Sequence, residues 1–309
     1  MIIIDGKKCS TERREEIKEL TQIFKDECGF TPTLGIIHVG DDPASESYVK
    51  GKKQALLDVG MEYVLARCDS SITEEELINQ IESFNNEPSI TGILVQLPLP
   101  KHIDADNVLS HIIPEKDVDG LTASNIGNMM IDPTISEDYN YFIPCTPKGI
   151  LYLLETYKIK TENKTIVIIG RSNIVGRPIA NLLSKNAEYA NANIILLHSK
   201  TEDLSYYTTL ADIIILAAGK PNLLTPDMVK QDTVIIDVGV NRIPSTETKS
   251  GFKLVGDCNY KEFENKVSYI TPVPGGCGPM TITMLLDNLI QASYIKSRKT
   301  DKIYNQLKY

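Results

Sequence analysis

One stretch of the chain limits its possible folds more than any other: KTIVIIGRSNIVGRPIANLLSK, at residues 164–185. A run of β-branched residues leads into a glycine turn, and the turn leads into an apolar, periodic segment. This order of strand, turn and helix is typical of doubly wound domains, in which the turn presents backbone N–H groups to a pyrophosphate. Gly170, Ser172 and Gly176 hold the turn as G-x-S-x-x-x-G. That pattern departs from the standard G-x-G-x-x-G, and similar turns occur in α/β domains that bind no dinucleotide. We predict a Rossmann-like doubly wound domain, with further strands at 193–199, 211–219 and 232–240.

The part of the chain before this stretch has its own alternation of helices and strands. Helices are expected at 10–28, around 47–53 and at 73–86, and strands at 33–40, 63–68 and 90–100. Such alternation predicts a second α/β layer with a parallel sheet. Near residue 146, Thr146-Pro147 precedes an apolar periodic run, which predicts a helix with Thr146 as its N-cap and Pro147 at its first position. We place the domain boundary there.

The residues after the second strand of the Rossmann-like domain indicate which nucleotide binds. In NAD-binding units a carboxylate about 20 residues beyond the glycines accepts from the ribose 2′-OH. Here the strand ends with His198, Ser199 and Lys200 and has no carboxylate, and Arg171 lies inside the glycine turn. A guanidinium and a hydroxyl suit a 2′-phosphate. We therefore predict NADP, with the alternative that Arg171 and Lys200 are ordinary exposed residues.

A lysine-rich stretch, SYVKGKK at residues 47–53, raises the question of a catalytic pair. On a helix, Tyr48 and Lys52 lie four positions apart and share one face, while Lys50 and Lys53 project elsewhere. By itself the stretch is more typical of a solvated basic helix. A catalytic role therefore needs support from the rest of the chain.

Composition disfavours several other classes of protein. The chain of 309 residues has the length of two domains, and its formal net charge of −9 disfavours nucleic acid as a partner. The six cysteines form no C-x-x-C pair and the four histidines have no metal-ligand spacing, so we expect reduced thiols and no metal site. No apolar run approaches the roughly 20 residues that span a bilayer, and the first residues do not resemble a signal peptide. We expect a cytoplasmic protein without a membrane partner.

Eight stretches resemble, in order and approximate spacing, the bifunctional methylenetetrahydrofolate dehydrogenase/methenyltetrahydrofolate cyclohydrolase family: SYVKGK, GILVQLPLP, PEKDVDGLT, PCTPKG, IGRSNIVGRP, HSKT, DVGVNR and TPVPGGCGPMT. The resemblance covers nearly the whole chain. It implies a folate-binding catalytic domain at 1–145, completed by a C-terminal helix at 279–309, and an NADP-binding domain at 146–278. It also implies a cleft where folate and nicotinamide meet, and a homodimer formed through the cofactor domain.

The same resemblance implies two steps on one carbon atom. Hydride leaves the methylene carbon of 5,10-methylenetetrahydrofolate for NADP, and water then opens the methenyl ring to give 10-formyltetrahydrofolate. Lys52 matches the family's catalytic lysine, which can take a proton from water if its pKa is lowered. By this likeness Tyr48 contacts the folate, and Gln96 contacts Lys52 and directs its proton. Such a role suits Gln96, because an amide donates and accepts hydrogen bonds without titrating.

Asp119 matches the family's pterin-binding carboxylate and completes the expected catalytic set, since a carboxylate can accept two adjacent N–H groups of an aminopyrimidine edge. Without the resemblance, Asp119 would be interpreted as a turn residue ahead of Gly120, and we expect Asp117 to have such a structural role. The substrate contacts implied by the resemblance are Tyr48, Lys52, Val95, Gln96, Leu97, Asp119, Pro274 and Gly275. The implied cofactor contacts are Gly170, Arg171, Ser172, Ser199, Val240 and Gly276.

Three features depart from the family pattern. The segment 185–193 is longer than usual, and its length affects the reach from the glycine turn to Ser199. Cys277 and Arg177 stand where small residues are common, and the tail at 296–309 has no counterpart.

Two other functions stay open on sequence grounds: a family member with dehydrogenase activity alone, and a non-catalytic NADP(H)-sensing protein. Short-chain dehydrogenases also use a Tyr-x-x-x-Lys pair, but their pair follows the nucleotide-binding fingerprint in the chain. Here Tyr48 precedes Gly170, so the order of the motifs excludes that family.

Overall fold

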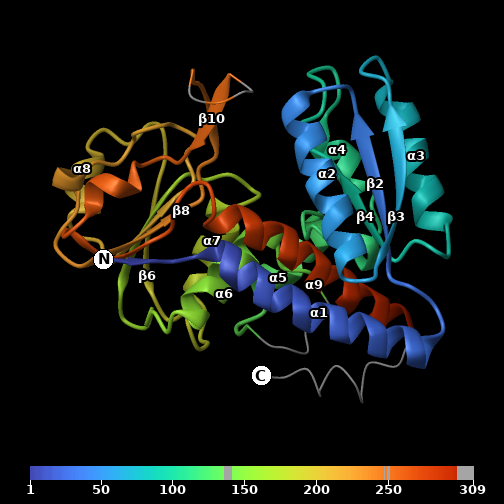
Figure 1. The fold of residues 1–309 in the computed structure, drawn as a ribbon, viewed down its shortest axis with the longest axis horizontal. Coiled ribbons are helices and arrows are strands. Elements are labelled where there is room, and N and C mark those ends of the chain that lie inside the picture. The colour runs from blue at the N-terminus through green and yellow to red at the C-terminus, as the bar shows by residue number, and fades with distance from the viewer. Residues whose placement is uncertain (136–140, 247, 249–250, 298–309) are drawn as a thin grey trace. The chain divides into compact units, whose positions relative to one another are not determined.

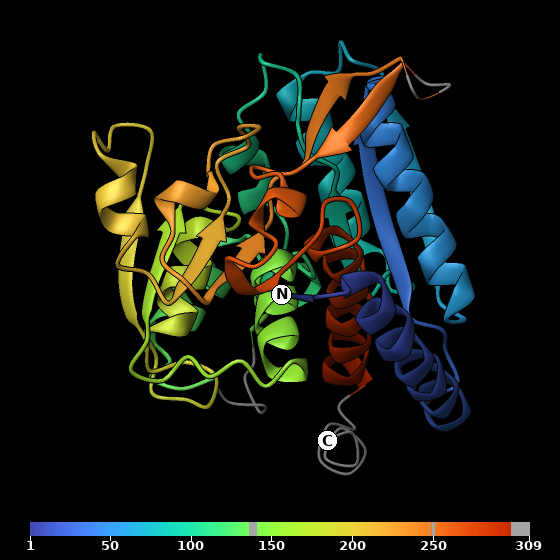
Figure 2. The same ribbon diagram turned by 60° about the vertical axis from the view of Figure 1, so that its left-hand side comes forward.

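The computed structural model describes residues 1–135, 141–246, 248 and 251–297, and the chain divides into two compact units. Unit 1 contains the described residues of Met1–Ser10, Met130–Tyr139 and Thr146–Thr281. Unit 2 contains those of Thr11–Met129, Asn140–Cys145 and Ile282–Tyr309. Figure 1 labels the elements, and Figure 2 shows them from a second direction.

Unit 1 is built on a six-stranded sheet in which all neighbouring strands are parallel, in the order β1-β11-β8-β7-β5-β6. The strands are β1 (Ile2–Ile3), β5 (Thr165–Ile169), β6 (Asn193–Leu197), β7 (Ile213–Leu216), β8 (Thr233–Asp237) and β11 (Val267–Ile270). The predicted strands at 193–199, 211–219 and 232–240 are confirmed, and β5 is flanked by β6 on one side and β7 on the other. This reversal of strand order at β5 is the doubly wound arrangement that the sequence predicts.

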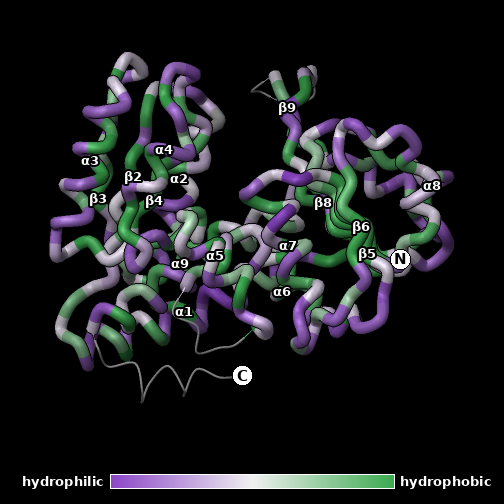
Figure 3. The backbone as a smooth tube through the Cα atoms, turned by 180° about the vertical axis from the view of Figure 1, so that it is seen from behind, coloured by the Kyte–Doolittle hydropathy of each residue, from purple (hydrophilic) through white to green (hydrophobic). Residues whose placement is uncertain are grey.

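The central strands of this sheet are buried on both faces and mainly apolar. Every residue of β7 and β8 is buried, and only Thr165 of β5 is not fully buried. Parallel strands covered on both faces are expected to be continuously apolar rather than alternating. Figure 3 shows green, hydrophobic backbone along these strands.

Helices and a separate β-hairpin accompany the sheet of unit 1. They are α6 (Cys145–Thr156), α7 (Gly176–Leu183), α8 (Leu204–Thr208), and a hairpin of β9 (Asn241–Pro244) and β10 (Phe252–Val255). Helix α6 begins at Cys145, so the prediction of Thr146 as N-cap and Pro147 as first residue was wrong by two positions. The first-turn N–H groups of a helix have no intrahelical acceptor, so Pro147 is tolerated in that turn without being its first residue.

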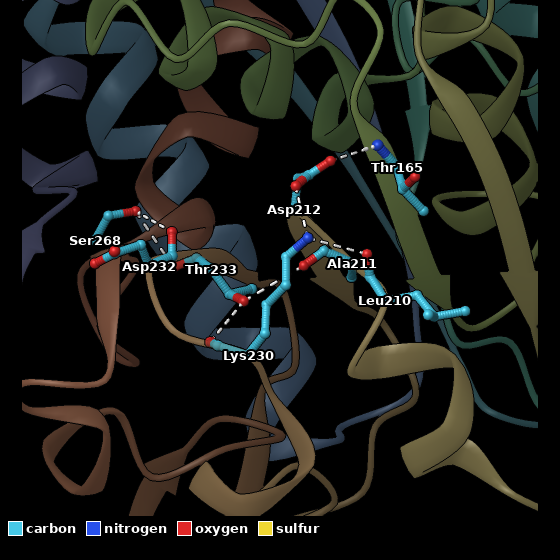
Figure 4. A network of polar contacts seen from close by, with 8 residues as sticks. All are labelled: Thr165, Leu210, Ala211, Asp212, Lys230, Asp232, Thr233 and Ser268. Atoms are coloured by element: carbon cyan, nitrogen blue, oxygen red, sulfur yellow. Dashed lines mark hydrogen bonds and ion pairs between the residues drawn. The ribbon is translucent and has the colours of Figure 1, made fainter.

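A polar network ties together the amino ends of β5, β7 and β8 (Figure 4). The Lys230 ammonium donates to the Asp212 carboxylate at 2.7 Å, and the other carboxylate oxygen of Asp212 accepts from the backbone N–H of Thr165 at 2.9 Å. The Thr233 hydroxyl donates to the backbone carbonyl of Lys230 at 3.0 Å. This network lies at the sheet edge opposite the glycine turn, which follows the carboxyl end of β5.

Unit 2 contains a three-stranded parallel sheet in the order β3-β2-β4. Its elements are β2 (Thr33–Val39), β3 (Glu62–Cys68), β4 (Gly92–Val95), α2 (Pro43–Asp58), α3 (Glu74–Asn86) and α4 (Ala105–Ser110). These elements confirm the predicted α/β alternation, although β4 ends at Val95 rather than at Pro98. Helices α1 (Gly6–Cys28) and α5 (Ala123–Ile131) each have residues in both units. Helix α1 begins four residues before its predicted start.

The predicted C-terminal helix corresponds to α9 (Cys277–Ser297), and the rest of its predicted span, 298–309, lies outside the described residues. The chain passes from unit 2 to unit 1 between Cys145 and Thr146. Residues Met1–Ser10 lie in unit 1, where β1 pairs with β11. In the described parts of the chain, no helix is both long and apolar enough to cross a membrane.

The end of helix α3 is anchored to the segment that leads to Asp119. The buried Lys116 ammonium donates to the carbonyl oxygens of Phe84, Asn85 and Glu87 at 2.8–2.9 Å. Helix C-termini leave such carbonyls without intrahelical partners, and a cation there is favourable. Lys116 therefore fixes the position from which the KDVDG turn starts.

Candidate active site

Lys52 and Gln96 are joined directly within unit 2. Lys52 lies on α2, and its ammonium donates to the Gln96 side-chain oxygen at 3.0 Å. Gln96 follows β4, where its backbone N–H donates to the Ile37 carbonyl of β2 at 2.9 Å and so continues the sheet. Its amide nitrogen donates to the Leu97 carbonyl at 2.6 Å. The amide is thereby oriented with its oxygen toward Lys52.

Burial lowers the pKa of Lys52, while the neighbouring Asp119 carboxylate and the Cys145 thiol act in the opposite direction. A lowered pKa increases the share of neutral amine near pH 7, which is the form that accepts a proton. Tyr48, one helical turn earlier, is 42% exposed, and its partial burial raises the pKa of the phenol. The Tyr48 hydroxyl therefore stays protonated near neutrality, available as a hydrogen-bond donor.

The KDVDG turn places its two aspartates in different environments. Asp117 is buried and accepts from the backbone N–H groups of Leu121 at 3.1 Å and Thr122 at 2.7 Å, which confirms its predicted structural role. Asp119 is half-buried and close enough to Lys52 to influence its titration. Gly120 has φ +72°, and a Cβ there would lie 2.7 Å from the Phe142 carbonyl oxygen, so only glycine fits. The turn thus holds Asp119 beside Lys52 while Asp117 secures the backbone.

The glycine turn of unit 1 is compact because two backbones meet in it. Gly170 has φ +126°, and a Cβ on it would lie 2.2 Å from the Ala217 carbonyl oxygen at the end of β7. A Cβ on Gly176 would lie 1.9 Å from the Gly170 carbonyl oxygen. The Ser172 hydroxyl accepts from the Val175 N–H at 3.3 Å and so helps to shape the turn. Arg171 is exposed on its surface.

The strand register brings the predicted phosphate ligands to neighbouring positions. Ile169 of β5 pairs with Leu197 of β6, and Arg171 and Ser199 each stand two residues beyond that pair. The Gly170 N–H donates to the Leu197 carbonyl at 3.0 Å, which continues the pairing into the turn. The longer segment 185–193 therefore leaves HSKT beside the glycine turn.

The other predicted contact residues vary in what they offer a ligand. The Val95 side chain is buried in the apolar core of unit 2, so only its backbone is available, and Leu97 is half-buried. In unit 1, Val240 is 42% exposed, Pro274 is exposed, and Gly275 has φ +110°. Gly276 is buried against Pro272, whose carbonyl oxygen would lie 2.6 Å from an added Cβ.

Three buried polar residues near these segments were not predicted from the sequence. Asn288 of α9 donates to the carbonyls of Val118 at 2.9 Å and Ile143 at 3.0 Å, which secures the backbone next to Asp119. Asp237 and Asp257 lie at the carboxyl edge of the unit 1 sheet, and each is at most 1% exposed. The DVGVNR and GDC stretches do contain these aspartates, but only the fold shows that both are buried.

Comparison with known proteins assigns the chain to a family. Residues 4–119 match the family model of the tetrahydrofolate dehydrogenase/cyclohydrolase catalytic domain, and residues 144–297 match that of the corresponding NAD(P)-binding domain. The chain belongs to the tetrahydrofolate dehydrogenase/cyclohydrolase family. Its activities are accordingly those of a bifunctional methylenetetrahydrofolate dehydrogenase and methenyltetrahydrofolate cyclohydrolase, as the sequence predicts.

Individual members of the tetrahydrofolate dehydrogenase/cyclohydrolase family are similar over almost the full chain. The bifunctional protein FolD of Chloroherpeton thalassium is 46% identical, over 94% of this chain and 98% of its own. The crystal structure of FolD from Campylobacter jejuni has a TM-score of 0.87 at 46% identity and covers 96% of this chain and 99% of its own. The Trypanosoma brucei enzyme, solved with NADP cofactor and an inhibitor, has a TM-score of 0.90 at 32% identity, covering 96% and 99%.

Asp237 leads to a prediction about stability and pH. Burial raises the pKa of this carboxyl to about 6, whereas an aspartate in an unfolded chain titrates near 3.9. The folded protein thus holds the proton more tightly, and the resulting stability is present below about pH 4 and lost as the pH rises through about 6. Between pH 4 and pH 7, we expect the free energy of unfolding of wild type to fall by up to about 3 kcal/mol relative to that of Asp237→Asn.

Urea unfolding of both proteins at pH 4, 5, 6 and 7 measures this difference. Comparison with the variant at each pH isolates the contribution of the Asp237 carboxyl. A difference in unfolding free energy that stays constant over this range would show that the pKa of Asp237 is the same in the folded and the unfolded protein.

Proposed function

We propose that Lys52 is the proton acceptor of the cyclohydrolase step, that Tyr48, Gln96 and Asp119 assist at the same centre, and that NADP is the preferred cofactor. The hydrogen bond of 3.0 Å between the Lys52 ammonium and the Gln96 oxygen, together with the lowered pKa of Lys52, carries this proposal. These observations distinguish Lys52 from a lysine on a solvated helix face, which would keep its ordinary pKa.

The residues act on a carbon atom that lies between N5 and N10 of the folate. The residues of the glycine turn would hold NADP, which would supply the hydride acceptor, and loss of hydride from this carbon gives the methenyl cation. Water then adds to the carbon while neutral Lys52 takes one of its two protons. The remaining hydroxyl proton passes to N5 as the bond between the carbon and N5 breaks, which leaves the formyl group on N10 and one proton on Lys52. Gln96 holds the amine in place, and the Tyr48 hydroxyl donates a hydrogen bond to the folate.

Asp119 is proposed to bind the pterin through paired N–H···O bonds. Asp119 is half-buried, and both of its neighbours in the chain are held in place. Gly120 has a conformation that only glycine adopts there, and the Val118 carbonyl accepts from Asn288, which supports this role. The negative charge of Asp119 also lies near the Lys52 amine and favours the ammonium form once the proton has been transferred.

The cofactor preference is tested by the variant Arg171→Ala. A charge-assisted hydrogen bond to phosphate contributes about 1.5 to 3 kcal/mol, so we expect the preference for NADP over NAD, measured as kcat/KM, to fall about tenfold to a hundredfold. Arg177→Ala is the matched control, because the Arg177 guanidinium donates to Asn173 at 2.9 Å instead of standing free in the turn. A wild type that prefers NAD, or an equal loss for both cofactors, would contradict the phosphate site.

A single assay tests both activities and the dehydrogenase-only alternative. Purified protein is mixed with 5,10-methylenetetrahydrofolate and either cofactor, and the absorbance of the methenyl product is followed as it forms and decays. We expect formation to be faster with NADP, followed by decay. A methenyl product that accumulates and decays no faster than without enzyme would favour the dehydrogenase-only member.

The resemblance to the family supports a proposal about the assembly and the location of the protein. We propose a homodimer formed through the cofactor domain, in the cytoplasm. Light scattering of the purified protein, which gives its molar mass in solution, distinguishes a dimer from the 34.4 kDa monomer.

A further inference from the structure

A buried carboxylate lies beneath the loops at the carboxyl edge of the unit 1 sheet. Asp257 is 0% exposed, and one of its oxygens accepts from the backbone N–H groups of Ala218 at 2.8 Å and Gly219 at 3.0 Å. The other oxygen accepts from the Lys220 N–H at 2.8 Å and the Asn241 amide at 2.9 Å. Four donors thus converge on one carboxylate.

The run 218–220 has the geometry of an anion-binding nest. Gly219 has φ +65°, and successive N–H groups around such a residue form a concavity that accepts an anion. Here the side chain of Asp257 fills the concavity, so the N–H groups of this loop are directed into the protein. They are therefore not available to a phosphate, which leaves the glycine turn after β5 to bind it.

The same carboxylate fixes a second loop. Asp257 accepts from the side-chain amide of Asn241, which is the first residue of β9. A Cβ on Gly239 would lie 2.2 Å from an oxygen of the Asp257 carboxylate. The segment 239–241 is therefore packed directly on Asp257, and it carries the exposed Val240 between its two contacts.

Both loops border the crevice in which a doubly wound domain binds its ligand. Such domains bind ligands outside the carboxyl ends of the strands, where the strand order reverses, which in unit 1 is between β5 and β7. Run 218–220 follows β7 and is packed against the glycine turn through Ala217 and Gly170. Segment 239–241 follows β8, the next strand of the sheet.

We propose that Asp257 is a positioning residue for the cofactor: it shapes the crevice by holding the loops after β7 and β8 without touching the cofactor. This inference rests on the proposed cofactor site at the glycine turn. Asp257 acts on the dehydrogenase step alone, because the residues proposed for the hydrolysis of methenyltetrahydrofolate lie in unit 2.

The variant Asp257→Asn tests the proposal, since an amide of the same shape turns its NH₂ group toward N–H groups that need an acceptor. We expect the dissociation constant and the KM for NADP to rise at least tenfold. The cyclohydrolase rate on supplied methenyltetrahydrofolate should stay within twofold of wild type. Asp227→Asn is the control, because Asp227 is exposed in the same unit and bonds to the Thr225 hydroxyl.

Calorimetric titration of wild type with NADP and with NAD separates this inference from the proposed function. A wild type that binds NAD more tightly overturns the cofactor choice, and the Asp257→Asn comparison is then made with NAD. Unchanged cofactor affinity in a folded Asp257→Asn protein overturns the positioning role, as does an equal loss of both activities, which a purely structural residue would cause.

If Asp257→Asn does not fold, Asn241→Ala provides the second measurement. It removes one of the four donors and leaves the three backbone bonds to Asp257 in place. We expect a several-fold rise in the KM for NADP with the cyclohydrolase rate unchanged, and an unaltered KM would refute the proposal.

Discussion

The Lys52→Met variant is expected to have a cyclohydrolase rate at least about 100-fold lower than wild type, because general acid–base groups contribute about 10² to 10⁴ in rate. Methionine retains the length of the side chain but cannot take a proton from water. Of the described residues, Lys52 is the one amine bonded to Gln96 and influenced by Asp119. The rate is measured as the decay of methenyltetrahydrofolate absorbance, and calorimetric titration with NADP should show cofactor binding close to wild type.

Lys53→Met is the matched control for this prediction. Lys53 is the next residue of α2, and its ammonium lies over the Tyr63 ring, 4.9 Å from the centroid, on another part of the helix surface. We expect Lys53→Met to retain the wild-type rate. If Lys52→Met opens methenyltetrahydrofolate as fast as wild type, SYVKGKK is a solvated helix face and the proton acceptor lies elsewhere.

Asp119→Ala is expected to weaken folate binding much more than NADP binding. A carboxylate that pairs with ligand N–H groups in a closed site contributes about 2 to 4 kcal/mol, because its loss leaves those donors unsatisfied. This corresponds to an affinity lower by about 30-fold to 1,000-fold, which calorimetric titration with a folate ligand measures.

Glu115→Ala is the control for charge, because Glu115 is an exposed acidic residue of the same segment. Asp117→Ala provides the contrast for a structural aspartate, since it removes the acceptor of the Leu121 and Thr122 N–H groups and should mainly lower the melting temperature. If Asp119→Ala weakens the binding of folate and of NADP equally and lowers the melting temperature as Asp117→Ala does, Asp119 is a structural turn residue like Asp117.

The sequence was sufficient to predict the elements whose cause is local. Strands β2, β5 and β8 are rich in apolar, mostly β-branched residues. Helix α3 begins at a capping box in which the Thr73 hydroxyl accepts from the Glu76 N–H at 3.2 Å. Lys52 and Gln96 were paired only through the resemblance to a family. Their separation of 44 positions carries no periodic pattern.

Features that depend on distant parts of the chain were not predicted. Strand β1 has two residues, too few for a pattern, and becomes a strand only because β11 offers it an edge. The capping role of Lys116 and the four donors of Asp257 likewise come from segments far away in sequence. A buried charge is recognisable once its partners are known, and those partners are set by the tertiary fold.

The pairing of β1 with β11 has a consequence for how the protein folds during synthesis. Ile2 leaves the ribosome long before its strand partner Tyr269, which lies far later in the chain. At about 5 to 20 residues per second this wait is on the order of tens of seconds. Unit 2 also waits, because α9 supplies Asn288 to the Val118 and Ile143 carbonyls. Each unit thus needs a late segment of the chain for its native contacts, so both are expected to form these contacts almost together, once Tyr269 and Asn288 have left the ribosome.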